Sequence, residues 1–175
     1  MNDIKETYQL GMNLYQRFST KIDEMYQKVG NKLDINYEEL IEEMNQYLIA
    51  LSLVVSQADK MIKESELEFI NYVFKTNFNE DNIDLNNHLS IINKIPNFVK
   101  LSVYTDKAYD AELKVIKPTY CQTTYDFLLR FPTYLKFSDG HVPEEEDITL
   151  KKSLNVIIDY YKKNYVRYAR QRKED

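Results

Sequence analysis

The sequence predicts an all-α bundle of about seven helices, folded as a single domain over residues 1–175. Along most of the chain, apolar residues recur at spacings of three and four, which is the period of one helix face. Only three Gly and four Pro occur, so turns are scarce and a β-sandwich is disfavoured. Hydrophobic residues make up 43% of the chain and charged residues 29%, which suits a packed core with a solvated surface.

Residues 1–30 are expected to form one long N-terminal helix with a heptad seam. The apolar positions alternate in steps of four and three: Ile4, Tyr8, Gly11, Tyr15, Phe18, Ile22, Met25 and Val29. Gly30 suits the left-handed residue that ends a helix. The seam packs either on the rest of the same chain or on a partner. The partner would be a second copy of the chain, in a homodimer, or a helix of another protein. On the second interpretation, the partner-binding residues are Tyr15, Phe18, Ile22 and Met25.

A second helix is expected over residues 36–57, and its wide apolar sector predicts the most buried helix of the bundle. This sector contains Leu40, Ile41, Met44, Tyr47, Leu48, Leu51, Val54 and Val55. A third helix should resume near Glu64, followed by a loop over residues 76–87, which are rich in Asn and Asp. A short helix then ends near Pro96, and another begins at about Asn97.

Two further helices complete the expected bundle. Pro118 suits the first residue of the sixth helix, and Pro132 should kink that helix. The last helix starts at Pro143 or Glu144 and carries the stripe Leu154, Ile157, Tyr161, Tyr165 and Tyr168. Residues 166–175 form a basic tail, which either offsets the helix dipole or contacts an acidic protein surface or RNA.

An internal repeat has an offset of 80 residues. Residues 58–66 read ADKMIKESE and residues 138–146 read SDGHVPEEE; each copy follows an apolar helix. In each copy a hydrophobe follows the Asp by three residues, and acids follow it by five and seven. Gly140 supplies a positive φ for the turn. Because Glu66 and Glu146 fall near the third residue of a new helix, both can cap free backbone N–H groups.

At these residues the chain resembles the TerB-like superfamily, which includes tellurite-resistance TerB and the N-terminal domain of DjlA-type co-chaperones. That family repeats Ala-Asp-Gly, a hydrophobe two residues later, and a Glu near the start of the next helix. The second copy matches with Asp139, Gly140, Val142 and Glu146, whereas the first has Lys60 in place of the Gly. The resemblance covers residues 37–165 and implies an all-helical two-fold repeat and a non-enzymatic module tied to stress responses and larger assemblies.

The resemblance also implies a metal site formed by the acids of both copies. Its candidate ligands are Asp59, Glu66, Asp139 and Glu146. If the two halves pack about a pseudo-twofold axis, these carboxylates converge and raise each other's pKa unless a positive charge lies among them. Oxygen ligands suit Ca²⁺ or Mg²⁺ better than zinc. Alternatively, Lys60 neutralises one pair and each Glu serves only as a helix cap.

The sequence disfavours several classes of function. It has no Gly-rich phosphate loop, nucleophile elbow or paired-His zinc motif, so we expect no enzyme; His88 and His141 are interpreted as surface or capping residues. The single cysteine, Cys121, excludes an internal disulfide and is interpreted as a small buried hydrophobe. A net charge of −5 disfavours nucleic-acid binding.

Two further observations bear on location. The most apolar run, residues 47–55, is too short to cross a bilayer, and the N-terminus does not resemble a signal peptide. We therefore expect a cytoplasmic protein without membrane insertion. The abundance of Lys, Asn, Ile and Tyr suggests a bacterial or phage origin.

Two hypotheses of function remain from the sequence. The first is a TerB-like module that binds a divalent cation or takes part in a stress response, acting through protein–protein contacts. The second is an adaptor, inhibitor or secretion-chaperone type protein that binds another protein through its N-terminal helix and Tyr-rich faces, without metal. The fifteen Tyr residues favour the second, because Tyr is enriched at interfaces.

Overall fold

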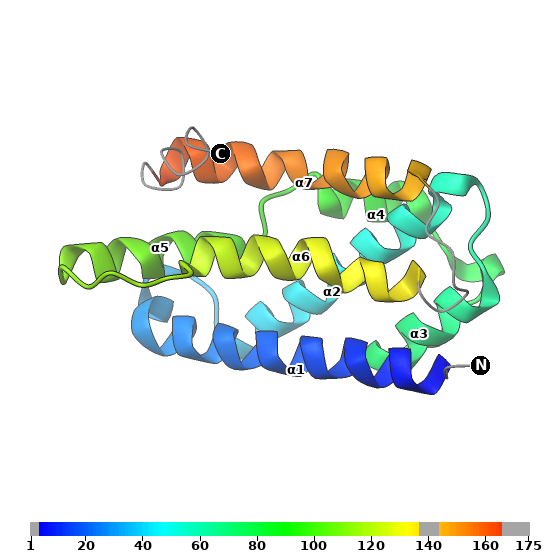
Figure 1. The fold of residues 1–175 in the computed structure, drawn as a ribbon, viewed down its shortest axis with the longest axis horizontal. Coiled ribbons are helices and arrows are strands. Elements are labelled where there is room, and N and C mark those ends of the chain that lie inside the picture. Colours follow the sequence, from blue (N-terminus) through cyan, green and yellow to red (C-terminus); the bar gives the residue numbers. More distant parts are fainter. Residues whose placement is uncertain (1–3, 137–143, 166–175) are drawn as a thin grey trace.

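The computed structural model describes residues 4–136 and 144–165 (Figure 1). Within these residues the regular structure is helical and contains no strand, which confirms the all-α class. The helices are α1 (Ile4–Val29), α2 (Tyr37–Ser56), α3 (Glu64–Phe74), α4 (Leu85–Ile92), α5 (Asn97–Ala111), α6 (Tyr120–Lys136) and α7 (Glu144–Asn164). Three short 3₁₀ turns join them: η1 (Gly30–Lys32), η2 (Gln57–Asp59) and η3 (Glu80–Asn82). None of the helices described is both long enough and apolar enough to span a membrane.

Helix α2 lies at the centre of the bundle. Figure 1 shows α1 along the lower edge, α6 across the middle and α7 along the upper edge, with α2 and α4 in the more distant part of the view. The contacts agree with this arrangement, since α2 packs against α4, α6 and α7, while α1 packs against α5 and α6. Every residue from 47 to 56 is buried, as expected from the wide apolar sector of this helix.

The start of α2 is fixed by a reciprocal cap. The Asn36 side chain accepts a hydrogen bond from the Glu39 backbone N–H at 2.8 Å, and the Glu39 carboxylate accepts one from the Asn36 N–H at 3.4 Å. This capping box satisfies two backbone donors that the first turn of a helix leaves free. It explains why the helix begins at Tyr37, although its apolar face begins only at Leu40.

The start of α6 is capped from a neighbouring helix. Asp106 of α5 is 2% exposed, and its carboxylate accepts the backbone N–H groups of Tyr120 at 2.8 Å and of Cys121 at 2.9 Å. Thr119 adds a third cap by accepting the N–H of Gln122 at 3.1 Å. The prediction that Pro118 is the first residue of this helix is therefore wrong, because the capping groups start the helix at Tyr120.

The heptad seam of α1 packs inside the chain. Phe18, Ile22 and Met25 are 3%, 0% and 0% exposed, and the Phe18 ring stacks on Phe127 of α6 with ring centroids 3.8 Å apart. Tyr15 is half-buried, and its hydroxyl donates to Asn45 Oδ1 of α2 at 2.7 Å. The assignment of these four residues to a partner surface is therefore corrected. Their side chains are covered by the chain's own helices, which was the alternative interpretation of the seam.

Two glycines of the N-terminal segment permit close packing. A Cβ atom at Gly11 would lie 2.5 Å from the Phe69 ring, so this glycine lets α1 approach α3. Gly30 does not take the predicted left-handed conformation; the chain passes directly from α1 into η1. A Cβ atom there would lie 2.8 Å from the Tyr26 ring. The close approach of that ring, and not a left-handed backbone, accounts for this glycine.

Candidate functional site

The acids of the repeat occupy the turns that precede α3 and α7. Glu66 lies in the first turn of α3, is 2% exposed, and accepts the backbone N–H of Lys63 at 2.8 Å. This contact confirms the predicted capping role. Burial raises the pKa of Glu66, while the hydrogen bond and charge of Lys63 and the Ser56 hydroxyl oppose the rise. Glu146 lies at the corresponding place in α7 and is 1% exposed.

The first repeat turn forms without a glycine. Lys60 has φ 73° and ψ 9°, the left-handed conformation that Gly140 was expected to supply in the second copy. Asp59 stabilises this turn, because its carboxylate accepts the backbone N–H of Met61 at 3.1 Å. The Lys60 side chain is exposed, so a non-glycine residue is accommodated here at the cost of a strained backbone. Gly140 and Asp139 lie outside the described residues.

The four predicted metal ligands do not appear as a cluster in the part of the chain that the structure describes. Among residues 4–136 and 144–165, no three His, Cys, Asp or Glu side chains are grouped so that they could hold a metal ion. The turn η2, which ends at Asp59, nevertheless contacts α7, which carries Glu146. The first repeat turn therefore packs against the helix that carries Glu146, and a site completed by Asp139 stays a prediction.

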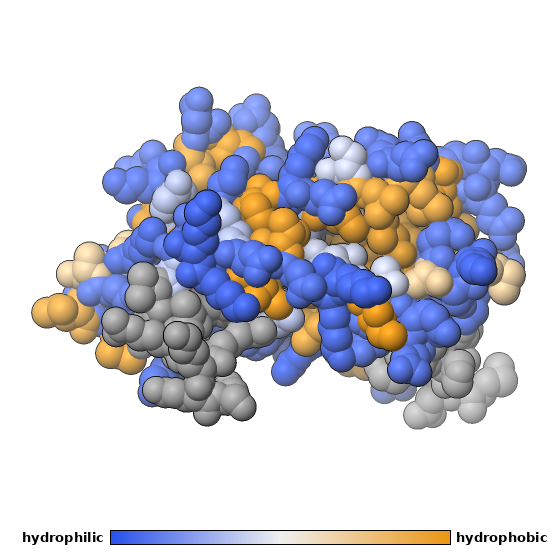
Figure 2. Space-filling view, turned by 90° about the horizontal axis from the view of Figure 1, so that it is seen from above, coloured by the Kyte–Doolittle hydropathy of each residue, from blue (hydrophilic) through white to orange (hydrophobic). Residues whose placement is uncertain are grey.

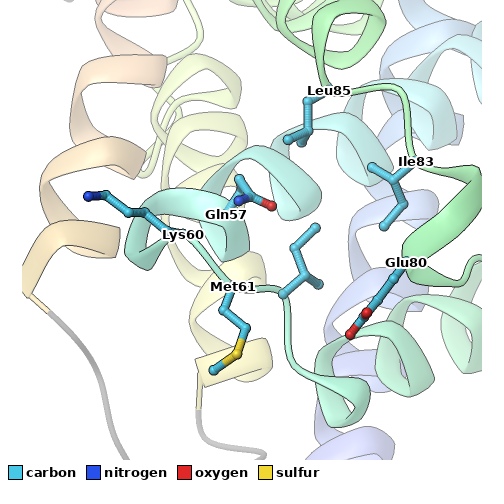
Figure 3. A pocket seen from close by; sticks show the side chains of 7 residues that line it. Gln57, Lys60, Met61, Glu80, Ile83 and Leu85 are labelled. Carbon is cyan, nitrogen blue, oxygen red and sulfur yellow. The ribbon is translucent and has the colours of Figure 1, made fainter.

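An apolar hollow of about 310 Å³ opens beside η2 (Figure 3). It is lined by Gln57, Lys60, Met61, Ile62, Glu80, Ile83 and Leu85. Figure 3 shows Leu85 and Ile83 pointing toward Gln57 across the hollow, while Lys60 points away from it. Ile62, the hydrophobe three residues after Asp59 in the first repeat copy, is 7% exposed, whereas the neighbouring Met61 is 61% exposed at the rim. The hollow can therefore accept an apolar side chain.

An acidic hollow of about 460 Å³ adjoins the apolar hollow and shares Glu80 with it. Its lining is Glu64, Leu67, Glu68, Asn71, Phe78, Asn79, Glu80 and Asp81. Four of these side chains are carboxylates, and no Lys or Arg is among the described residues that line it. These carboxylates also affect a side chain of α1, because burial and the Glu68 carboxylate together raise the pKa of Tyr8 to about 12. The hollow therefore presents a negative potential to solvent.

Asparagine side chains hold the loop that contributes lining residues to both hollows. Asn71 of α3 accepts the backbone N–H of Phe78 at 2.7 Å and donates to the Phe78 carbonyl at 2.9 Å. Asn82 donates to the Asn77 carbonyl at 2.9 Å and accepts the Asn79 N–H at 2.9 Å. The Asn-rich composition, which predicted only a loop, thus specifies a loop with a defined conformation that places Glu80 between the hollows.

Apolar side chains also reach solvent on the face formed by α4 and α7. Figure 2, viewed from above Figure 1, shows apolar groups gathered between ridges of polar side chains. Leu89 of α4 and Ile148 of α7 are each 43% exposed.

The remaining reactive side chains are enclosed. Cys121 is fully buried, as predicted, and burial together with the Asp106 carboxylate raises the pKa of its thiol. His88 is 8% exposed and packs near the Phe78 ring, so its assignment to the surface is corrected. His141 lies outside the described residues. A thiol held protonated in the core is not available as a nucleophile.

Comparison with known proteins adds no relative to this geometry. The search found no family model, curated protein or solved structure that matches this chain. The resemblance to TerB-like proteins therefore stays a hypothesis based on the repeat residues.

Proposed function

We propose that the chain is a non-catalytic protein-interaction module whose binding surface is the apolar hollow together with the adjoining acidic hollow. The observation that carries this proposal is the position of Glu80, which borders both: an apolar floor formed by Ile62 and Ile83 continues directly into a group of four carboxylates. Binding surfaces commonly combine an apolar pocket for an anchor side chain with charged groups at the rim.

The charge of this surface indicates what it binds. A partner segment with one apolar side chain next to Lys or Arg residues would place the apolar side chain against Ile83 and Leu85, and its cations beside Glu68 and Asp81. Complementary charges of this kind speed association and select against acidic partners. The occupant we propose is therefore a basic peptide segment with an apolar anchor.

Peptide selection tests this proposal, since it does not require the natural partner to be identified. The full chain is used to select from a random peptide library, and the selected peptides are measured by fluorescence anisotropy. We expect them to share an apolar residue flanked by Lys or Arg, and to bind less tightly as salt is raised. Met61→Glu and Glu80→Lys should each weaken binding about tenfold or more.

Asp159→Lys is the matched control, because Asp159 is an exposed acid on α7 that lines neither hollow. It makes the same charge change as Glu80→Lys and should leave peptide binding unchanged. The proposal is rejected if no peptide is enriched, or if selected peptides bind both hollow variants as tightly as the wild type.

A second candidate function is cation binding by a TerB-like module. It is favoured by one observation: two buried glutamates, Glu66 and Glu146, lie 80 residues apart in equivalent turns, and η2 contacts α7. Calorimetric titration of chelator-treated protein with Ca²⁺ and Mg²⁺ tests it. Binding heat that disappears in the Asp139→Asn, Glu146→Gln variant would support the site; no heat in the wild type would reject it.

A further inference from the structure

A third hollow, of about 260 Å³, lies between α1 and α6, and none of its residues lines either hollow described above. Its lining is Leu14, Arg17, Phe18 and Lys21 from α1, Thr123, Asp126, Phe127 and Arg130 from α6, and Pro118 at the edge. On each helix these residues follow the spacing i, i+3, i+4, i+7, so each helix contributes one face. We call this site the interhelical hollow.

The floor of the interhelical hollow is aromatic and rigid. Phe18 and Phe127 stack with ring centroids 3.8 Å apart and an interplanar angle of 8°. Both rings are held in turn by other aromatic side chains: Phe18 by a T-shaped contact with Phe98, and Phe127 by Phe131. The two rings are 3% and 4% exposed, so they form a fixed apolar surface that does not collapse into the hollow.

The rim carries two arginines whose charges no described side chain neutralises. Arg17 and Arg130 are exposed, and neither forms an ion pair or side-chain hydrogen bond with any of residues 4–136 or 144–165. The other charged groups are already engaged: Lys21 pairs with Glu24 at 2.7 Å, and Asp126 accepts a hydrogen bond from Gln122 at 2.7 Å. Within the described ranges, both guanidinium groups are therefore without a protein partner.

Arginine is rare in this chain, and its positions are concentrated in two places. The chain has a net charge of −5 and only five arginines, three of which lie in residues 166–175. Both of the others line the interhelical hollow, although they come from distant parts of the sequence. Lys supplies the positive charge elsewhere on the described surface, and guanidinium differs from ammonium in presenting a planar fork of donors to carboxylate or phosphate oxygens.

We propose that the interhelical hollow binds a small organic anion, with its carboxylate or phosphate between Arg17 and Arg130 and its apolar body against Phe18 and Phe127. The hollow is slightly smaller than the roughly 300–1,000 Å³ of sites for drug-sized ligands, which restricts the ligand to a compact molecule. This site is independent of the proposed protein-binding surface.

Three commercially available probes test the proposal on the full chain. 2-Naphthoate and 1-naphthyl phosphate carry the two candidate anions on a flat apolar body, and 2-naphthalenemethanol is their neutral analogue. Calorimetric titration should show that at least one anion binds and that the neutral analogue binds at least about tenfold more weakly. The anion that binds more tightly shows whether the hollow prefers a carboxylate or a phosphate.

The arginines are then exchanged singly. Arg17→Gln and Arg130→Gln should each weaken anion binding about tenfold or more, and the corresponding changes to Lys should restore only part of the loss, because Lys keeps the charge but not the fork. Lys162→Gln, on the exposed face of α7, removes a charge outside the hollow and should have no effect. Melting temperatures show whether each variant is folded.

Chemical-shift mapping on the wild type provides a readout that needs no variant. Addition of the tighter anion should shift the backbone resonances of residues 14–21 and 123–130 and leave those of α4 unchanged. The proposal is overturned if neither anion binds at millimolar concentration, if the Gln variants bind as the wild type does, or if the shifts map elsewhere.

Discussion

A buried histidine gives the chain a pH response at the scale of one residue. His88 is 8% exposed and lies in α4, four residues after Asp84, whose backbone carbonyl accepts its N–H. Burial lowers the pKa of the His88 imidazole, and the Asp84 charge opposes this effect only in part. The neutral imidazole is therefore favoured in the folded chain more than in the unfolded chain.

The His88→Gln variant should remove one part of the acid sensitivity. As pH falls below about 6.5, the unfolded chain takes up a proton that the folded chain resists, so the free energy of unfolding of the wild type decreases. We expect urea unfolding between pH 7.5 and 5.5 to show a steeper loss of stability in the wild type than in the variant. Parallel pH profiles would contradict the assignment of His88.

Three carboxylates that are buried or partly buried respond in the opposite direction. Burial raises the pKa of Glu43, Glu66 and Asp106, so the folded state binds protons more readily than the unfolded state above about pH 4.5. Their contribution makes the chain more stable as pH falls through that range. The comparison of wild type with His88→Gln separates the two effects, because these carboxylates are common to both proteins.

At the scale of elements, single side chains set how closely helices approach and where they begin. Gly11 brings α1 against Phe69 of α3, and Asp106 of α5 starts α6. The periodicity that predicts the helices contains neither piece of information. Before the neighbouring helix is known, Gly11 looks like any other seam position, and Asp106 looks like any other polar residue of a helix. This is why helix existence was predictable and the start of α6 was not.

Gly11→Ala tests the close approach of α1 and α3. Alanine is a better helix former by about 1 kcal/mol, but its Cβ would meet the fully buried Phe69 ring at 2.5 Å. Overpacking of this kind costs about 1–3 kcal/mol, so we expect a net loss in the free energy of unfolding of about 1–2 kcal/mol. Urea unfolding measures it, with Gln16→Ala on the exposed face of α1 as control. A stabilised variant would show that the Phe69 ring can move aside.

Asp106→Asn tests the cap between α5 and α6. The carboxylate accepts two backbone N–H groups, whereas an amide has a single acceptor oxygen, so one buried donor loses its partner. We expect a loss of about 1–3 kcal/mol in the free energy of unfolding. Asp159→Asn, an exposed acid of α7, should change it little. Equal stabilities of the two variants would exclude a capping role.

At the scale of the whole molecule, the heptad seam shows the limit of pattern analysis. A seam buries the same side chains whether it packs on its own chain or on a partner. The spacing of Phe18 and Ile22 therefore predicts that they are buried, but not whether the same chain or a partner covers them. The three hollows could not be predicted from the sequence either. Arg17 and Arg130 are far apart in the chain, and the loop around Glu80 is positioned by side-chain bonds from Asn71.

Phe18→Glu, Ile22→Glu distinguishes the two packing modes. In the structure both side chains lie in the core, and an unpaired buried charge costs several kcal/mol, so two of them approach the total stability of a domain of roughly 5–15 kcal/mol. We expect loss of the helical circular dichroism signal. Gln16→Glu, Thr20→Glu adds the same charge to the exposed face of α1 and should stay folded. A folded core variant that only loses a larger species in gel filtration would restore the partner interpretation.

The enclosure of α2 determines which part of the chain keeps its amide hydrogens longest. Residues 47–56 are covered on every side, so when one neighbouring helix opens, the others still pack on this stretch and keep its helical hydrogen bonds closed. Deuterium can enter this stretch only when the whole bundle opens. A single peptide from the middle of α2 therefore reports the global opening free energy under native conditions. Its exchange rate would register any ligand that binds the folded chain, because each raises that free energy by RT ln(1 + [L]/Kd), where [L] is the free ligand concentration.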